Sequence, residues 1–133
     1  HSMGEHGALV IELRCPELYK SISAFAPTVA ASQVPWGKKA FTHYLGETET
    51  LWKSYDAIEL IKNAEVHLPI LVDQGTADDF LEEQLRPKLL SDICLEQEYP
   101  LTLNLREGYD HSYYIIASFI EKHLEFHSKF LAK

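Results

Sequence analysis

The sequence predicts an α/β fold in which parallel strands are covered by helices on both faces. Short apolar segments typical of strands alternate along the chain with longer segments of helical periodicity, which is the pattern of a parallel sheet. The 133 residues are enough for one domain with a core and too few for two. With 46% hydrophobic and 24% charged residues, the composition also favours a globular protein.

The chain begins with a predicted helix followed by a predicted strand. Apolar residues recur at helical spacing over Gly4–Arg14, and Pro16 marks the end of that helix. The segment Lys20–Phe25 is short, alternates apolar with polar side chains and stops before Pro27, so we expect a strand there. An irregular stretch should follow, because the sequence 35–37 (Pro-Trp-Gly) is typical of a turn.

The middle of the chain predicts a second helix, a buried strand and a third helix. Trp52–Asn63 is the helical candidate. Ile70–Asp73 is a continuous apolar run that ends at an acid, which favours a strand buried on both faces. Pro69 should occupy the first position of that strand, since it cannot donate a hydrogen bond to the sheet. Phe80–Leu95 predicts a helix that is interrupted, or begins again, at Pro87.

The last two predicted elements are a strand and a long helix. Leu101–Leu105 alternates apolar and polar residues, so this strand should have one polar face. The helix Ser112–Leu131 should turn one apolar stripe toward the core: Tyr113, Ile116, Ile120 and Leu124. Three strands make a poor sheet, because an open side leaves an apolar edge uncovered, and a strand before residue 1 would be its natural neighbour.

Charge and cysteine content restrict the partners and the cellular compartment. The net charge of −8 argues against nucleic acid and against anionic membrane surfaces, both of which favour basic patches. The sequence holds neither an apolar run of transmembrane length nor the arrangement of a secretory signal, and we expect a cytoplasmic protein. Cys15 and Cys94 lack metal-type spacing, so we expect two reduced thiols.

The first residues allow two interpretations of Ser2. The sequence Ser2-Met-Gly4 matches the second part of a G-x-S-x-G nucleophile elbow, in which glycine permits a strained turn between a strand and a helix. Serine is also a favoured helix N-cap. Taken alone, this short motif favours the N-cap.

Acids and a histidine follow two later strands and favour the catalytic interpretation. Asp78 and Asp79 come after the buried strand, and His111 lies in the loop after the next strand. In α/β-hydrolases the catalytic residues follow the order Ser, acid, His, with the acid and the histidine on loops after strands. The order and the loop positions in this chain therefore fit one active site.

Several stretches together resemble the S-formylglutathione hydrolase family, also called esterase D: HSMG-HGAL, SAFAP, VPWGKKAF-YLG, DQGTADDFL and GYDHSYYIIASFIEKHLEFH. The resemblance covers nearly the whole chain. It implies that residues 1–133 are the C-terminal part of a single α/β-hydrolase domain. The N-terminal strands and the loop that gives one oxyanion donor would then precede His1.

The resemblance also implies a role for individual residues. Ser2 would be the nucleophile, Asp78 the acid of the triad and His111 the base. The backbone N–H of Met3 would donate to the oxyanion. Trp36 resembles a family tryptophan near the acyl pocket, although an anchor in the core explains this residue equally well. If the neighbouring acid, Asp79, held the histidine instead, the assignment would be wrong by one position.

The implied activity is a serine thioesterase that hydrolyses S-formylglutathione without a metal or organic cofactor. Two alternatives stay open: a general carboxylesterase acting on small esters, and a non-catalytic fragment that pairs with another chain, for example as a homodimer. Glu5 stands where the family has a second glycine, and residues 28–33 lack the expected Asn-Pro pattern; either departure could relax the active site. His123 and His127 have a spacing that can bind zinc, but no third ligand is evident in the sequence, so the face of the last helix explains them better.

Overall fold

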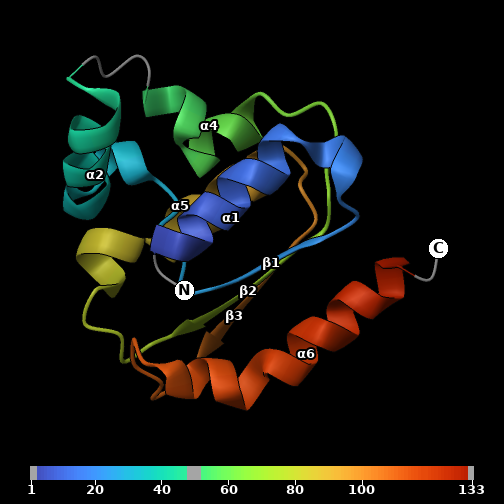
Figure 1. Cartoon of the computed structure of the whole chain (residues 1–133). Helices are drawn as coiled ribbons and strands as arrows, with labels where there is room; N and C mark the ends of the chain where they lie inside the picture. Colours follow the sequence, from blue (N-terminus) through green and yellow to red (C-terminus); the bar gives the residue numbers. More distant parts are fainter. Residues whose placement is uncertain (1–2, 48–51, 132–133) are drawn as a thin grey trace.

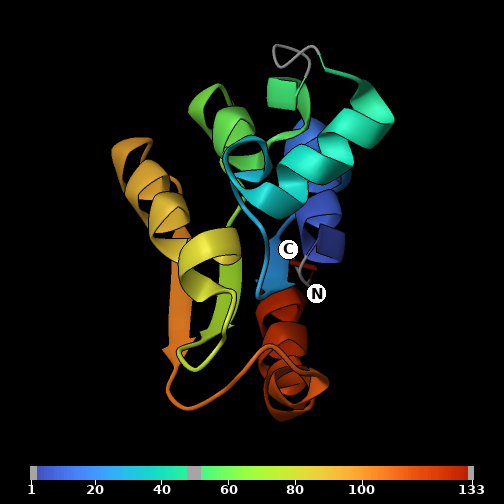
Figure 2. The same ribbon diagram turned by 90° about the vertical axis from the view of Figure 1, so that its left-hand side faces the viewer.

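The computed structural model describes residues 3–47 and 52–131. Three parallel strands form one sheet in the order β1-β2-β3, with bounds Ile22–Phe25, Ile70–Gly75 and Leu101–Arg106. One face of the sheet is covered by α1 (Met3–Arg14), α4 (Ala57–Lys62) and α5 (Pro87–Glu96), and the opposite face by α6 (Tyr113–Leu131), as Figures 1 and 2 show. The predicted parallel sheet with helices on both faces is confirmed.

The central strand β2 carries the core. Every residue from Ile70 to Gly75 is buried, because β1 and β3 flank this strand and helices cover it above and below. The main cluster of buried apolar side chains joins α1, β1, α4, β2 and α5. The strand predicted over Ile70–Asp73 is therefore correct, and it continues for two further residues, which brings Gln74 into the buried layer.

The stretch around Pro35 contains a helix that the sequence interpretation missed. Residues Pro35–Leu45 form α2, although a turn was predicted at its start. Proline fits the first turn of a helix because its fixed φ is already helical and its absent N–H would have no partner there. The inward side of α2 packs Phe41 against Trp52, with ring centroids 5.8 Å apart.

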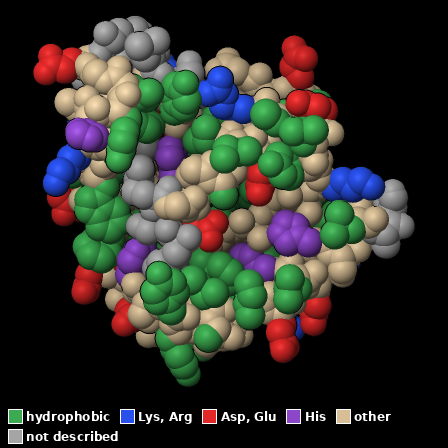
Figure 3. Space-filling model, in the orientation of Figure 1, with side chains coloured by type: hydrophobic (Ala, Val, Ile, Leu, Met, Phe, Trp, Pro, Cys, Tyr) green, Lys and Arg blue, Asp and Glu red, His purple; other side chains and the backbone are tan. Residues whose placement is uncertain are grey.

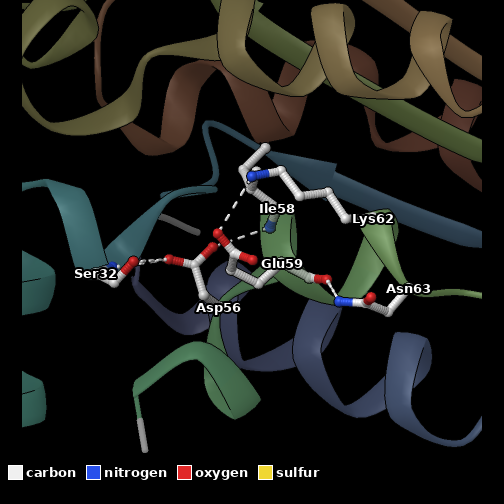
Figure 4. Close-up of polar contacts among 6 residues, drawn as sticks. All are labelled: Ser32, Asp56, Ile58, Glu59, Lys62 and Asn63. Carbon is white, nitrogen blue, oxygen red and sulfur yellow. Dashed lines mark hydrogen bonds and ion pairs between the residues drawn. The ribbon is translucent and has the colours of Figure 1, made fainter. Parts of the chain in front are cut away.

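The helix predicted over Trp52–Asn63 is divided by Asp56. A 3₁₀ turn, Lys53–Tyr55, precedes the break, and α4 begins at Ala57. Asp56 is fully buried and extended, and its Oδ1 accepts a hydrogen bond from the backbone N–H of Ile58 at 3.0 Å, so it caps α4. Its Oδ2 accepts from the backbone N–H of Ser32 at 2.9 Å (Figure 4), which ties α4 to the segment before α2.

Replacing Asp56 should be one of the more damaging single changes on this face of the sheet. We expect Asp56→Ala to lower the free energy of unfolding by about 2–3 kcal/mol, because it removes a cap and leaves buried N–H groups unpaired. Urea denaturation would measure the change. The control is Glu59→Ala on the same helix, which removes only the 3.3 Å ion pair with Lys62 and should cost about 0.5 kcal/mol or less. Equal losses would contradict this role of Asp56.

The third predicted helix is interrupted, as expected. Leu81–Leu85 form a single π-helical turn, and α5 begins at Pro87. Between them, Arg86 adopts a left-handed backbone with φ of 44°. The residue before a proline is disfavoured in the helical region, and the interruption at this position follows from that restriction.

The inward face of α6 differs from the prediction. Tyr113, Ile120 and Leu124 were expected in the core, but Tyr113 is 79% exposed and Leu124 is 63% exposed. The buried positions of this helix are Ile115 and His123 instead. A histidine could take a core position because a buried acid of β2 contacts it, and apolar periodicity alone cannot reveal such a partner.

One side of the sheet exposes the edge of β1. Within residues 3–47 and 52–131, β1 is paired with β2 alone. Ile22 and Phe25 are nevertheless buried by α1 and α6 on the two faces. Figure 3 shows hydrophobic and histidine side chains gathered over α6 on this side.

Two further expectations from composition can be compared with the structure. Cys15 and Cys94 are free thiols, as expected, and burial raises the pKa of Cys94 to about 12. Among the helices of the described ranges, none has both the length and the apolar character needed to cross a bilayer.

Candidate active site

Asp78 and His111 meet at the edge of the sheet where the strands end. Asp78 lies in the loop after β2, and His111 lies in the loop between β3 and α6. The Nδ1–H of His111 donates to Oδ2 of Asp78 at 2.7 Å. The Asp78 side chain is fully buried and that of His111 is 14% exposed. The pair therefore consists of a fully buried carboxylate and a partly exposed imidazole.

The carboxylate of Asp78 is held at both oxygens. Oδ1 accepts from the backbone N–H of Phe80 at 2.9 Å, and Oδ2 accepts from Nε2 of Gln74 at 3.1 Å as well as from His111. Asp79 is exposed. The geometry thus favours Asp78 over its neighbour as the acid that contacts His111.

The loops that carry the pair are joined by backbone contacts. Ala77 N–H donates to the carbonyl of Tyr109 at 3.0 Å, and Gly108 N–H donates to Oγ1 of Thr76 at 3.1 Å. Gly75 makes this approach possible, because a Cβ atom there would lie 2.1 Å from the Tyr109 carbonyl oxygen. Close packing of the two loops brings Asp78 within hydrogen-bond distance of His111.

Aromatic side chains line one side of His111. The ring of Phe80 lies edge-on to the imidazole with centroids 5.2 Å apart, and Trp36 lies 6.0 Å from it. Trp36 is half-buried, packs on Phe80 at 4.5 Å, and its backbone N–H donates to Gln84. Trp36 thus lies near His111 and is also packed against the ring of Phe80.

The predicted nucleophile, Ser2, lies outside the described residues. Met3 is the first residue of α1, which begins on the side toward which the strands point (Figures 1 and 2). One turn further on, His6 fixes the start of this helix: its ring nitrogens lie 2.8 and 2.7 Å from the carbonyl oxygens of Thr28 and Tyr55. The start of α1 and the His111 loop are therefore at the same end of the sheet.

A buried ionic cluster under α6 was not predicted from the sequence. Asp73 on β2 accepts from Nε2 of His123 and from Nε of Arg106, each at 2.6 Å. Burial alone would raise the pKa of Asp73, but the hydrogen bonds from His123 and Arg106 outweigh it and hold that pKa below its usual value. Phe25 stacks on His123 with centroids 3.9 Å apart. An acid at the end of a fully apolar strand was the available signal.

The two histidines with zinc-type spacing face different partners. His127 lies 2.6 Å from Oγ of Ser21 and 2.8 Å from Oγ of Ser23, whereas His123 contacts Asp73. Burial, and secondarily the charge of His123, lower the pKa of His127. Across the described part of the chain, no three side chains of metal-binding type cluster. These contacts are consistent with the expectation that both histidines belong to the face of the last helix and not to a zinc site.

An apolar pocket lies away from this site. It has a volume of about 590 Å³ and is formed between α5, the turn before it and the exposed edge of β3. Thr76 lines it, but neither Asp78 nor His111 does. This pocket is therefore separate from the pair formed by Asp78 and His111.

Comparisons with known proteins agree with the arrangement. Residues 1–130 match the family model Esterase, described as "Putative esterase". A solved structure of an S-formylglutathione hydrolase from Agrobacterium tumefaciens is 45% identical, with a TM-score of 0.92 over 98% of this chain and 47% of that one. This chain thus spans about half the length of that relative.

More distant structures share the fold. An S-formylglutathione hydrolase from Staphylococcus aureus is 16% identical, with a TM-score of 0.72 over 95% of this chain and 51% of that one. Esterase B from Lactobacillus rhamnosis is 17% identical, with a TM-score of 0.73 over 98% and 50% of the two chains. At these identities the likeness extends to the fold alone, which is that of α/β-hydrolases.

Proposed function

Because this chain belongs to the esterase family, we propose that it supplies the triad Ser2, Asp78 and His111 of a serine thioesterase that hydrolyses S-formylglutathione. The observation that carries the proposal is the 2.7 Å hydrogen bond between His111 and Asp78 at the edge where the strands end. The 45% identity to an S-formylglutathione hydrolase supports the substrate. Formate and glutathione are the products.

The first half of the reaction acylates Ser2. The carboxylate of Asp78 accepts from Nδ1–H of His111, which leaves Nε2 unprotonated and able to take the proton of the Ser2 hydroxyl. Oγ of Ser2 then attacks the thioester carbonyl carbon. When the tetrahedral intermediate collapses, the C–S bond breaks, and the imidazolium gives its proton to the glutathione sulfur. Asp78 stabilises the imidazolium while it carries this charge.

The second half of the reaction releases formate. His111 takes a proton from a water molecule, and the resulting hydroxide attacks the formyl carbon on Ser2. The bond between that carbon and Oγ breaks, and His111 returns the proton to Oγ. This cycle needs no metal or organic cofactor, because the nucleophile and the base are protein groups.

The negative charge that develops on the carbonyl oxygen needs donors. The backbone N–H of Met3, at the start of α1, is one of them in this proposal, and the positive end of the helix dipole favours an anion there. A second donor would come from the segment that precedes residue 1 in the longer relatives. Trp36, near His111, would contact the small acyl group.

A second candidate is a general carboxylesterase with the same triad. Glu5, half-buried in the first turn of α1, is the observation that favours it. A carboxylate this close to the start of the helix adds negative charge near the oxyanion, which opposes the transition state. Rates on S-formylglutathione and on short acyl esters separate the two candidates.

A third candidate is a non-catalytic piece that pairs with another chain. The edge strand β1 favours it, because most of its side chains are buried while one side of its backbone is unpaired within the described residues. The helix α6 also exposes apolar side chains, such as Leu124, and burial of such side chains would favour pairing with another chain. Sedimentation of the isolated chain tests self-pairing, and a compact monomer would contradict a homodimer.

The isolated chain should hydrolyse p-nitrophenyl acetate poorly. We define the assembled enzyme as one polypeptide in which the N-terminal part of the Agrobacterium tumefaciens relative precedes this chain. Loss of one oxyanion donor typically lowers the rate about a hundred- to a thousand-fold, so we expect at least that difference in kcat between the assembled enzyme and residues 1–133 alone. The assembled enzyme should also cleave S-formylglutathione.

A phosphonate ester that phosphonylates active-site serines, with loss of its alcohol or phenol leaving group, identifies the nucleophile directly. In the assembled enzyme it should inactivate hydrolysis and modify one residue, Ser2, as identified by mass spectrometry of the proteolysed protein. Modification at another serine with full inactivation would end the proposal. Activity of the isolated chain equal to that of the assembled enzyme would contradict the need for the additional segment.

A further inference from the structure

Gln74 is fully buried beside Asp78 and His111, near the end of the central strand β2. Its Nε2 donates to Oδ2 of Asp78 at 3.1 Å and to the carbonyl oxygen of Gly75 at 3.1 Å. Oδ2 of Asp78 is the same atom that accepts from His111. One carboxylate oxygen therefore lies between an amide N–H and an imidazole N–H.

These contacts fix the plane of the Asp78 carboxylate. Oδ1 is held by the backbone N–H of Phe80, and Oδ2 is held by Gln74. A carboxylate restrained at both oxygens cannot rotate away from the imidazole. Because Gln74 is part of β2, the restraint is connected to the central, fully buried strand of the sheet.

The amide oxygen of Gln74, Oε1, has an unfavourable environment. Its Oε1 is buried and has no hydrogen-bond partner among the described residues. Burying an unpaired polar atom costs free energy, and an apolar side chain of the same volume would avoid that cost. The amide is therefore explained by the hydrogen bond that its Nε2 donates to Asp78.

We propose that Gln74 is a positioning residue that holds the Asp78 carboxylate in line with His111. The inference rests on the proposed function, since it assigns Gln74 to the same triad. It acts through Asp78 and does not contact the substrate. A donor at Oδ2 also shares the negative charge of the carboxylate, and a second carboxylate at position 74 would repel it.

Two substitutions in the assembled enzyme test the inference. Gln74→Met keeps the volume but removes both donors, so we expect kcat for p-nitrophenyl acetate to fall roughly 10- to 100-fold with KM changed by about twofold at most. Gln74→Glu should lose more activity as the pH rises, because its carboxylate ionises beside Asp78. The control is Gln97→Met, the same chemical change at the end of α5, which should retain the parent kcat.

A proton NMR measurement on the 133-residue chain separates this inference from the proposed function. The Nδ1–H of His111 should give a sharp, strongly downfield signal in the parent and in Gln97→Met, and a broadened one in Gln74→Met. If the assembled enzyme is inactive but the signal broadens as expected, the proposed function fails and the inference about Gln74 holds. Parent-like kcat and a parent-like signal in Gln74→Met would overturn the inference.

Discussion

Asp78→Asn should lower kcat/KM of the assembled enzyme for p-nitrophenyl acetate by about 10⁴-fold. The asparagine has nearly the same shape, so the fold should survive. Its amide cannot stabilise an imidazolium, and it can donate to Nδ1 of His111, which places the imidazole proton on Nε2. In the proposed mechanism, Nε2 would then already carry a proton and could not accept the one from the Ser2 hydroxyl. Steady-state kinetics with a far-UV circular dichroism check of folding would measure the effect.

Asp79→Asn is the matched control for this experiment. The two acids are adjacent, but Asp79 is exposed, while Asp78 is buried against His111 at 2.7 Å. We expect kcat/KM of Asp79→Asn within about threefold of the parent, as for most exposed sites away from a network. A loss at position 79 larger than that at position 78 would mean that the acid has been assigned to the wrong residue.

Asp73→Asn should destabilise the protein by about 3–5 kcal/mol at neutral pH. The substitution keeps the volume but leaves Arg106 and His123 without the buried charge that both contact at 2.6 Å. Removing one partner of a buried ion pair is more damaging than replacing the whole pair, because the remaining charges stay desolvated. Urea unfolding at pH 7 would measure the change. Asp92→Asn, at an exposed acid on α5, should change stability by less than about 0.5 kcal/mol.

The stability difference between the parent and Asp73→Asn should depend on pH in one direction. The folded-state pKa of Asp73 lies below its unfolded value, so the ionised acid stabilises the folded state at any pH above that unfolded value, about 3.9. As the pH falls from there through the folded pKa, this contribution disappears. Unfolding curves at pH 7 and at pH 3 should therefore show the difference shrinking, and a difference that grows on acidification would contradict the assigned network.

Much of the fold could be predicted because it depends on local pattern. The apolar run from Ile70 and the alternation from Leu101 each correspond to a strand. The errors arose where one residue has two structural meanings. Pro35 was interpreted as a turn but starts a helix, and Asp56 was placed inside a helix that it caps. Sequence alone cannot decide between these, because the deciding partner, such as Ser32 for Asp56, lies elsewhere in the chain.

The candidate site, like the fold, was predicted only in part. The order of strands, acids and histidine along the sequence predicted that an acid after β2 would meet His111, because the carboxyl ends of parallel strands share one edge. The choice of Asp78 over Asp79 came from the family resemblance. The supporting residues were missed because their partners are distant in sequence. Asp73 and His123 are 50 positions apart in the sequence. Only the fold shows that this contact places His123 on the buried face of α6. Gln74 lies just beyond the predicted strand Ile70–Asp73, and nothing in the sequence shows that its amide reaches Asp78.

In the proposed triad Ser2 and His111 act as one unit, and a double variant is the sharpest test of that coupling. Ser2→Ala and His111→Ala should each lower kcat of the assembled enzyme for p-nitrophenyl acetate by about 10⁴-fold or more. Because the base has no further role once the nucleophile is gone, the double variant should be no slower than the slower of the two single variants. Losses that multiply in the double variant would mean that the two residues act independently and do not form a triad.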